Sequence, residues 1–162
     1  METTDLVNIW VDADSCPVQV RTMIARFASR LKIKTYFVAN RNIPIVTKEK
    51  ISKETIKMII TESTPDAADN YIVENSQSND LVITRDIPLA TRLVEKKICV
   101  INDRGKLFTE ENIKQELSIR NFNLDLAKSG IYIEKNQIYN SKDLNNFSNC
   151  LDRILQKKLK TQ

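Results

Sequence analysis

The sequence LVNIWVDADSCPV, residues 6–18, decides the fold class of this chain. Its first part predicts a buried strand over Leu6–Val11, and acidic residues follow at once. Asp14 begins a helix cap, and a proline then lies near the first turn of a helix predicted over Val18–Leu31. A buried strand that runs directly into a helix is typical of a parallel sheet covered by helices.

The same alternation of strands and helices continues along the chain. Further strands are predicted over residues 33–39, 56–60, 81–84 and 98–101, and further helices over 66–75, from 86 to about 96, from 109 and from 141. Residues 40–55 lack clear periodicity and are interpreted as a loop with one helical turn. We predict one α/β domain over residues 1–155, doubly wound around a mainly parallel sheet, and a polar, basic tail over 156–162.

The composition narrows the class of protein. With 162 residues, one domain is expected. The three cysteines are an odd number without CxxC spacing, which argues against a disulfide framework and a zinc knuckle. The N-terminus lacks a basic region, and no uncharged apolar run reaches the roughly 18 residues of a membrane span. We therefore expect a cytoplasmic protein without a membrane partner.

Two scarce residue types exclude several kinds of site. The chain has no histidine, which removes Ser-His-Asp and Cys-His catalysis and histidine-ligated zinc. It has two glycines, too few for a P-loop or a GxGxxG turn. Chemistry at an active site would therefore depend on carboxylates and other polar groups, and carboxylate and water oxygens suit Mg²⁺ or Mn²⁺.

Acidic residues stand where predicted strands give way to helices. Asp12 and Asp14 follow the first strand, Asp66 and Asp69 begin a helix in the middle of the chain, and Asp86 follows the strand ending at residue 84. Ligands of open parallel sheets bind at the carboxyl ends of the strands. We expect the carboxyl groups of Asp12, Asp86 and Asp66 or Asp69 to lie within about 10 Å of each other, close enough to share a metal ion.

Helix capping is the alternative interpretation of these residues. An Asp cap accepts the free N–H groups of the first helical turn and contributes about 0.5–2 kcal/mol. One cap per helix suffices, however, and capping does not account for two acidic residues at one junction. Asp66 and Asp69 also share one side of a helical turn because they are three residues apart. By contrast, Asp80 precedes its strand and is expected at the opposite edge of the sheet.

Several polar residues beside the predicted strand ends are candidates for substrate binding. Arg41, Arg85 and Arg104 suit phosphate groups, although a solvated surface role is the alternative for each. Thr84 is interpreted as a ligand of a metal-bound water or as a helix cap. Cys16 lies at a helix start, but without a histidine base we favour packing as its role.

The charge is uneven along the chain. Residues 1–80 contain 10 Lys/Arg and 11 Asp/Glu, and residues 81–162 contain 15 and 10, so the net charge of +4 is the sum of −1 and +5. An acidic site beside a basic half would suit a phosphate-rich polymer such as RNA. A charge of this size spread over the surface is also ordinary.

Several blocks of sequence resemble the YaiI/YqxD family of uncharacterised bacterial proteins over roughly residues 7–155. The blocks are VDADSCP at 11–17, VANR at 38–41, DAAD at 66–69, DLVITRDIPLA at 80–90, and NDRG at 102–105 followed by Asn112-Ile113. The resemblance implies a PIN-like fold, whose better-studied relatives are Mg²⁺- or Mn²⁺-dependent ribonucleases with an acidic cluster at the sheet edge.

The resemblance also implies roles for residues. Asp12 matches the first-strand Asp of PIN domains, Thr84-Arg85-Asp86 resembles their late Thr/Ser-x-Asp element, and Asp66 and Asp69 resemble the acidic helix start. The chain departs from the pattern because residues 19–30 contain no acidic residue, and Asp14 is the substitute.

We therefore expect a metal-dependent phosphodiesterase, most simply a ribonuclease. Asp12, Asp86 and one or both of Asp66 and Asp69 would hold Mg²⁺ or Mn²⁺, and Asp14 would complete the catalytic set. The alternatives are a non-catalytic RNA-binding or regulatory module and a metal-dependent phosphatase of a small phosphate ester. Whether the chain forms a homodimer stays open.

Overall fold

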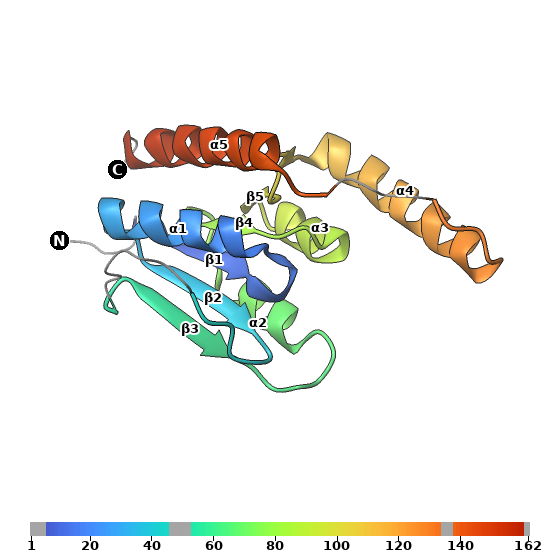
Figure 1. Cartoon of the computed structure of the whole chain (residues 1–162), viewed down its shortest axis with the longest axis horizontal. Helices are drawn as coiled ribbons and strands as arrows, with labels where there is room; N and C mark the ends of the chain where they lie inside the picture. Colours follow the sequence, from blue (N-terminus) through green and yellow to red (C-terminus); the bar gives the residue numbers. More distant parts are fainter. Residues whose placement is uncertain (1–5, 46–52, 134–137, 161–162) are drawn as a thin grey trace.

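A six-stranded sheet with helices on both faces forms the body of the protein (Figure 1). The computed structural model describes residues 6–45, 53–133 and 138–160. The strand order is β3-β2-β1-β4-β5-β6, in which β1 to β5 are parallel and β6 pairs antiparallel with β5. The predicted α/β fold with a mainly parallel sheet is confirmed.

The elements follow the alternation read from the sequence. The strands are β1 (Ile9–Asp12), β2 (Thr35–Ala39), β3 (Ile56–Ile60), β4 (Leu81–Ile83), β5 (Cys99–Ile101) and β6 (Leu107–Phe108). The helices are the short 3-10 helix η2 (Ala13–Ser15), α1 (Val18–Leu31), α2 (Ala67–Asn75), α3 (Ile87–Glu95), α4 (Glu110–Lys128) and α5 (Ser141–Lys160).

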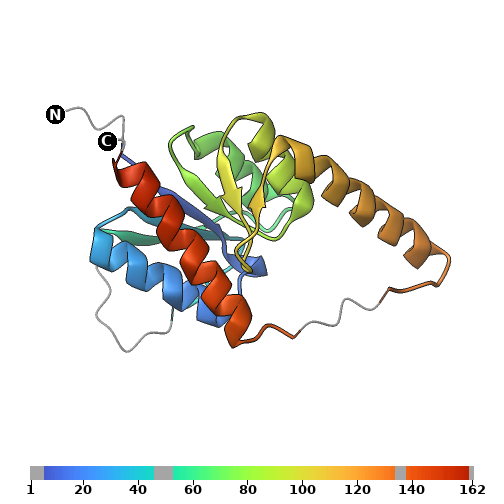
Figure 2. The same cartoon turned by 90° about the horizontal axis from the view of Figure 1, so that it is seen from above.

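Both faces of the central strand are buried, which explains its unbroken apolar run. Ile9 and Val11 pack into the core shared with α1 and α5, and Trp10 packs into the core under α2 and α3. Helices α1 and α5 lie beside each other on one face of the sheet (Figure 2). The opposite face carries α2 and α3, while α4 packs against α3 and projects beyond the sheet.

Two details differ from the sequence prediction. β6 was missed because a two-residue strand is too short to give a periodic signal. The predicted tail over residues 156–162 is wrong up to Lys160, because α5 continues to that residue and Leu159 packs against the core. Residues 46–52 of the predicted loop lie outside the described residues. Within the described ranges, no helix is long and apolar enough to cross a membrane.

The topology creates a crevice between β1 and β4. The chain leaves β1 through α1 to reach β2, whereas β4 leads through α3 to β5 on the other side of the sheet. Such a reversal of direction between neighbouring strands opens a cleft at their carboxyl ends. Asp12 ends β1 and Thr84 follows β4, so the cleft opens between these two residues.

Candidate metal centre

Three carboxylates from three separate elements meet in this cleft. Asp12 ends β1, Asp69 lies in the first turn of α2, and Asp86 caps α3. One carboxylate oxygen from each of the three lies within 4.8 Å of the others. The predicted convergence within about 10 Å is therefore confirmed.

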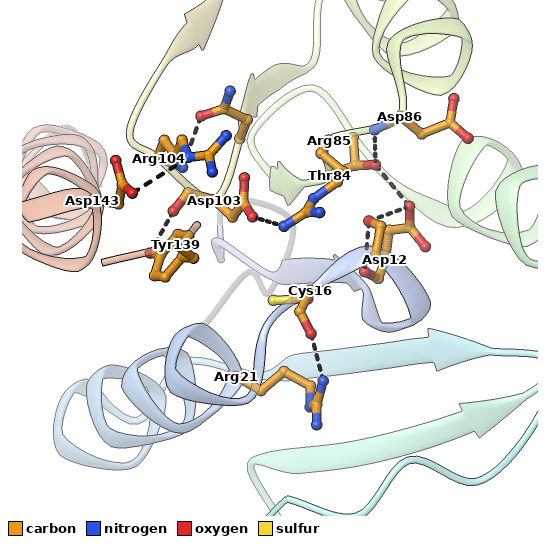
Figure 3. A network of polar contacts seen from close by, with 12 residues as sticks. Asp12, Cys16, Arg21, Thr84, Arg85, Asp86, Asp103, Arg104, Tyr139 and Asp143 are labelled. Atoms are coloured by element: carbon orange, nitrogen blue, oxygen red, sulfur yellow. Dashed lines mark hydrogen bonds and ion pairs between the residues drawn. The ribbon is translucent and has the colours of Figure 1, made fainter. Parts of the chain in front are cut away.

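Two hydroxyl groups hold the Asp12 carboxylate in place. The Ser15 hydroxyl donates to Asp12 Oδ2 at 2.9 Å, and the buried Thr84 hydroxyl donates to the same oxygen at 2.8 Å. Thr84 Oγ1 also accepts the Asp86 backbone N–H at 3.0 Å (Figure 3). Thr84 therefore links two of the three acidic residues and fixes their relative position.

Helix capping explains only one of the four acidic residues assigned to a metal. The Asp86 carboxylate accepts the Leu89 N–H at 3.1 Å and caps α3. Asp12 and Asp66 stand at the cap positions of η2 and α2, but neither side chain makes the capping hydrogen bond. Asp66 also has a φ of 64°, a left-handed conformation that costs free energy for a residue with a side chain. Capping therefore does not account for the pair Asp12 and Asp69.

The electrostatics of the site reflect crowding of negative charge. Burial raises the pKa of Asp12, against the two hydroxyl hydrogen bonds that lower it, and the charges of Asp86 and Asp14 raise it further. The pKa of Asp69 is raised to about 7, first by burial and then by the charges of Asp86, Asp12 and Asp66. Near neutral pH, Asp69 therefore binds a proton more readily than an isolated carboxylate does.

The acidic residues line an open cavity of about 490 Å³. Asp14 and Asp66 belong to its wall, but they are not part of the close group formed by Asp12, Asp69 and Asp86. Asp14 Oδ1 accepts a hydrogen bond from Arg41 Nε at 3.2 Å at the exposed rim. The charge of Asp66 thus influences Asp69, but the Asp66 carboxylate lies outside the close group.

The four predicted substrate-binding residues lie in different surroundings. Arg41 lies at the cavity rim through its ion pair with Asp14. Arg85 is ion-paired with the buried Asp103 and borders a second cavity. Thr84 is buried and bonded within the acidic cluster, so its position suits orientation of Asp12 rather than contact with substrate.

Arg104 is the one predicted site residue that the structure places elsewhere. Its Nε lies 3.5 Å from the Asp143 carboxylate at the start of α5, and its guanidinium lies over the Tyr139 ring. The Tyr139 hydroxyl donates to the Asp103 carbonyl at 2.7 Å. Figure 3 shows this group on the far side of Arg85 from Asp12. Arg104 therefore joins the β5–β6 turn to α5.

Sequence reasoning missed two supporting residues. Ser15 lies three residues after Asp12, and its hydroxyl orients the Asp12 carboxylate. The buried carboxylate of Asp103 anchors Arg85. Cys16 is buried, and burial raises the pKa of its thiol to about 12, which agrees with the packing role favoured from the sequence.

Asp80 lies at the opposite edge of the sheet, as expected. Its carboxylate accepts hydrogen bonds from the backbone N–H groups of Asn8 and Gln77, from the Asn8 amide, and from Trp10 Nε1 at 2.9 Å. Four donors surround one buried carboxylate. Asp80 therefore ties the beginnings of β1 and β4 together and has a structural role.

Comparison with known sequences shows the family. The profile described as "Uncharacterized BCR, YaiI/YqxD family" matches residues 10–157. The chain belongs to the YaiI/YqxD family, and the resemblance seen in the motifs is confirmed.

Relatives extend over almost the whole chain. It is 49% identical over 154 residues to a UPF0178 protein of Treponema denticola, covering 95% of each sequence. It is 45% identical to a UPF0178 protein of Treponema pallidum, covering 95% of this chain and 84% of the relative. A UPF0178 protein of Psychromonas ingrahamii is 43% identical, with 96% and 99% covered. No solved structure gives a significant match.

Proposed function

We propose that this protein is a divalent-metal-dependent phosphodiesterase that hydrolyses RNA. The observation that carries the proposal is the convergence of Asp12, Asp69 and Asp86, whose oxygens lie within 4.8 Å of one another in an open cavity. Three carboxylates from the ends of different elements form a hard, oxygen-rich donor set, which suits Mg²⁺ or Mn²⁺.

The electrostatics support a cation at this position. The raised pKa values of Asp12 and Asp69 show that negative charge is crowded and partly desolvated there. A divalent ion would relieve this repulsion, and when bound it would activate water and stabilise charge on the phosphate oxygens. Asp12 and Asp86 would hold it from the sheet edge, and Asp69 would close the group from α2.

The surrounding residues contribute orientation. Thr84 and Ser15 fix the Asp12 carboxylate, and Thr84 also fixes the Asp86 backbone. In metal sites, such supporting hydrogen bonds hold the ligands in the geometry required for binding. Asp66 and Asp14 would add negative potential around the ion, and Arg41 would face substrate phosphate at the rim.

A mutation of Asp12 tests this proposal against the capping interpretation. Asparagine keeps the shape of the side chain but removes its charge, so Asp12→Asn should abolish Mn²⁺-dependent hydrolysis of labelled RNA while the protein stays folded. The Mn²⁺-induced rise in melting temperature should disappear as well. The matched control is Asp125→Asn, an exposed carboxylate on α4 that is paired with Lys128.

The assay should include RNA, DNA and a small aryl phosphodiester, each with and without Mn²⁺. Hydrolysis of RNA that depends on Mn²⁺ and on Asp12 would support the proposal. Absence of hydrolysis of all three, or equal activity in wild type and Asp12→Asn, would refute it. Hydrolysis of the small diester alone would favour a small phosphate ester over a nucleic acid as the substrate.

A further inference from the structure

A second cavity adjoins the acidic site. It has a volume of about 250 Å³ and lies between the start of α3 and the side of α4, lined by Arg85, Asp86, Ile87, Glu116, Ile119 and Arg120. Asp86 lines both cavities, so they meet at a carboxylate of the candidate metal centre. A chain bound at the metal centre can therefore pass Asp86 into the second cavity.

The two cavities differ in charge. The charged residues lining the first are all aspartates, whereas two arginines line the second. Two acidic residues, Asp86 and Glu116, also line the second cavity, and the Glu116 carboxylate forms an ion pair with Lys106 that partly offsets its charge. The second cavity thus offers guanidinium groups beside a site proposed to act on phosphodiesters.

The Arg85 side chain is both anchored and partly exposed. Its guanidinium forms an ion pair with the buried Asp103, whose carbonyl in turn accepts the Tyr139 hydroxyl (Figure 3). About half of the Arg85 side chain stays exposed, 49%. A guanidinium has five N–H donors, and an anchored one loses less conformational entropy when it binds phosphate.

Arg120 brings a second guanidinium from α4. In the parts of the chain that the structure describes, it has no ion-pair or hydrogen-bond partner. Its helix is fixed at the N-terminus by reciprocal hydrogen bonds between Thr109 and Asn112, and Ile113 is buried against the core. Arg120 is therefore a cation on a defined scaffold, without an ion pair among the described residues, and Glu116 lies one helical turn before it in the same cavity lining.

We propose that this second cavity binds a backbone phosphate of single-stranded nucleic acid, next to the phosphodiester held at the metal centre. This inference rests on the proposed function, and it names a polymer rather than a small phosphate ester as the substrate. Arg85 and Arg120 contact the phosphate, and Ile119 supplies an apolar surface beside it. Cationic grooves that follow the backbone are usual in single-strand binding.

The test compares Arg120→Gln with Lys114→Gln. Lys114 is an exposed cation on the same helix and does not line the cavity, so it controls for loss of one positive charge. Binding of a short fluorescent oligouridylate is measured by anisotropy over a range of salt concentrations, without divalent metal. Hydrolysis of RNA and of a small aryl phosphodiester is then measured with Mn²⁺.

Arg120→Gln should weaken oligouridylate binding about tenfold, as expected for loss of a charged hydrogen bond. The slope of log affinity against log salt is negative and should become shallower by about 0.7, the value for one phosphate contact on a single strand. Hydrolysis of RNA should fall with binding, and it should fall by a larger factor than hydrolysis of the aryl ester. Arg120→Lys should restore part of the affinity, and an unchanged melting temperature would show that the fold is intact.

Two results would overturn the assignment of this cavity. One is unchanged binding in Arg120→Gln, and the other is equal weakening in Arg120→Gln and Lys114→Gln, which would indicate general charge attraction. The outcome is separable from that of the proposed function. If neither substrate is hydrolysed but binding depends on Arg120 as stated, the phosphodiesterase proposal fails and the phosphate subsite stands.

Discussion

Replacing Asp69 by asparagine should stabilise the metal-free protein at alkaline pH. Asp69 lies beside Asp12 and Asp86, and its pKa is raised to about 7. A raised pKa means that the folded protein binds the proton more tightly than the unfolded chain does. Stability is therefore lost as the pH rises from about 4 to about 7 and the carboxylate ionises in the folded state. Asparagine removes the charge and with it this loss.

The size of the gain follows from the pKa shift. The pKa rises from 3.8 to about 7, and at about 1.4 kcal/mol per unit this gives an upper bound of about 4 kcal/mol. Because the side chain is partly exposed, solvent screening reduces the figure to about 1–2 kcal/mol. Loss of the favourable interaction with the α2 dipole subtracts about 0.3–1 kcal/mol. A net gain of about 1 kcal/mol corresponds to a rise in melting temperature of about 2–4 °C.

Thermal unfolding with a chelator at pH 8 and pH 5 measures this effect. The gain of Asp69→Asn should be largest at pH 8 and less than half as large at pH 5, where wild-type Asp69 is mostly protonated. The control is Asp152→Asn, an exposed carboxylate on α5, whose effect should be small and independent of pH. Destabilisation at pH 8, or an equal gain at both pH values, would refute the electrostatic reasoning.

Three further predictions concern residues at the two sheet edges. Thr84→Val should lose about 1–3 kcal/mol of stability, because two hydrogen bonds of the buried Thr84 hydroxyl disappear, and Mn²⁺ affinity should fall about 10- to 100-fold. Thr84→Ser should recover both, and full Mn²⁺ affinity in Thr84→Val would contradict the role of Thr84 in orienting Asp12. Mn²⁺ binding measured by calorimetry should weaken below pH 7, because Asp69 must lose its proton to act as a ligand. An Mn²⁺ affinity independent of pH between 6 and 8 would argue against Asp69 as a metal ligand. Asp80→Asn should destabilise the protein by about 1–3 kcal/mol in urea unfolding at both pH 5 and pH 8, because an amide cannot accept all four hydrogen bonds; a stable variant would show that the buried network contributes little.

The sequence predicts the sheet well because each parallel strand carries its own signal. β3 was predicted with the observed bounds, Ile56–Ile60, and α1 with the observed bounds, Val18–Leu31. Both have apolar residues in a pattern that local packing dictates. Such elements need no knowledge of distant residues.

Features that depend on distant contacts were not predictable. Gly105 has a φ of 82°, and a Cβ there would lie 2.5 Å from the Asn146 carbonyl oxygen of α5. The turn before β6 is thus shaped by close approach of a helix about 40 residues later in the sequence. The end of α5 did carry a signal, since Leu155 and Leu159 are four residues apart, but the surrounding lysines favoured a tail.

The candidate site was predictable as a group but not in its internal roles. The positions of Asp12, Asp69 and Asp86 follow from strand ends and topology. The choice between Asp66 and Asp69 required the structure, in which Asp69 belongs to the close group and Asp66 does not. Sequence spacing alone treats the two residues alike.

The two edges of the sheet show how the surroundings of a buried carboxylate indicate its role. At the amino edge, four hydrogen-bond donors converge on Asp80, so the protein itself compensates the charge. At the carboxyl edge, the hydroxyls of Ser15 and Thr84 both reach Asp12, but Asp69 and Asp86 bring two more carboxylates to within 4.8 Å. Hydroxyl dipoles cannot balance that charge, and burial together with the charges of Asp86, Asp12 and Asp66 raises the pKa of Asp69 to about 7. A metal ion bound as proposed would compete with a proton for this position, so the Asp69→Asn and Mn²⁺ measurements test the proposed function.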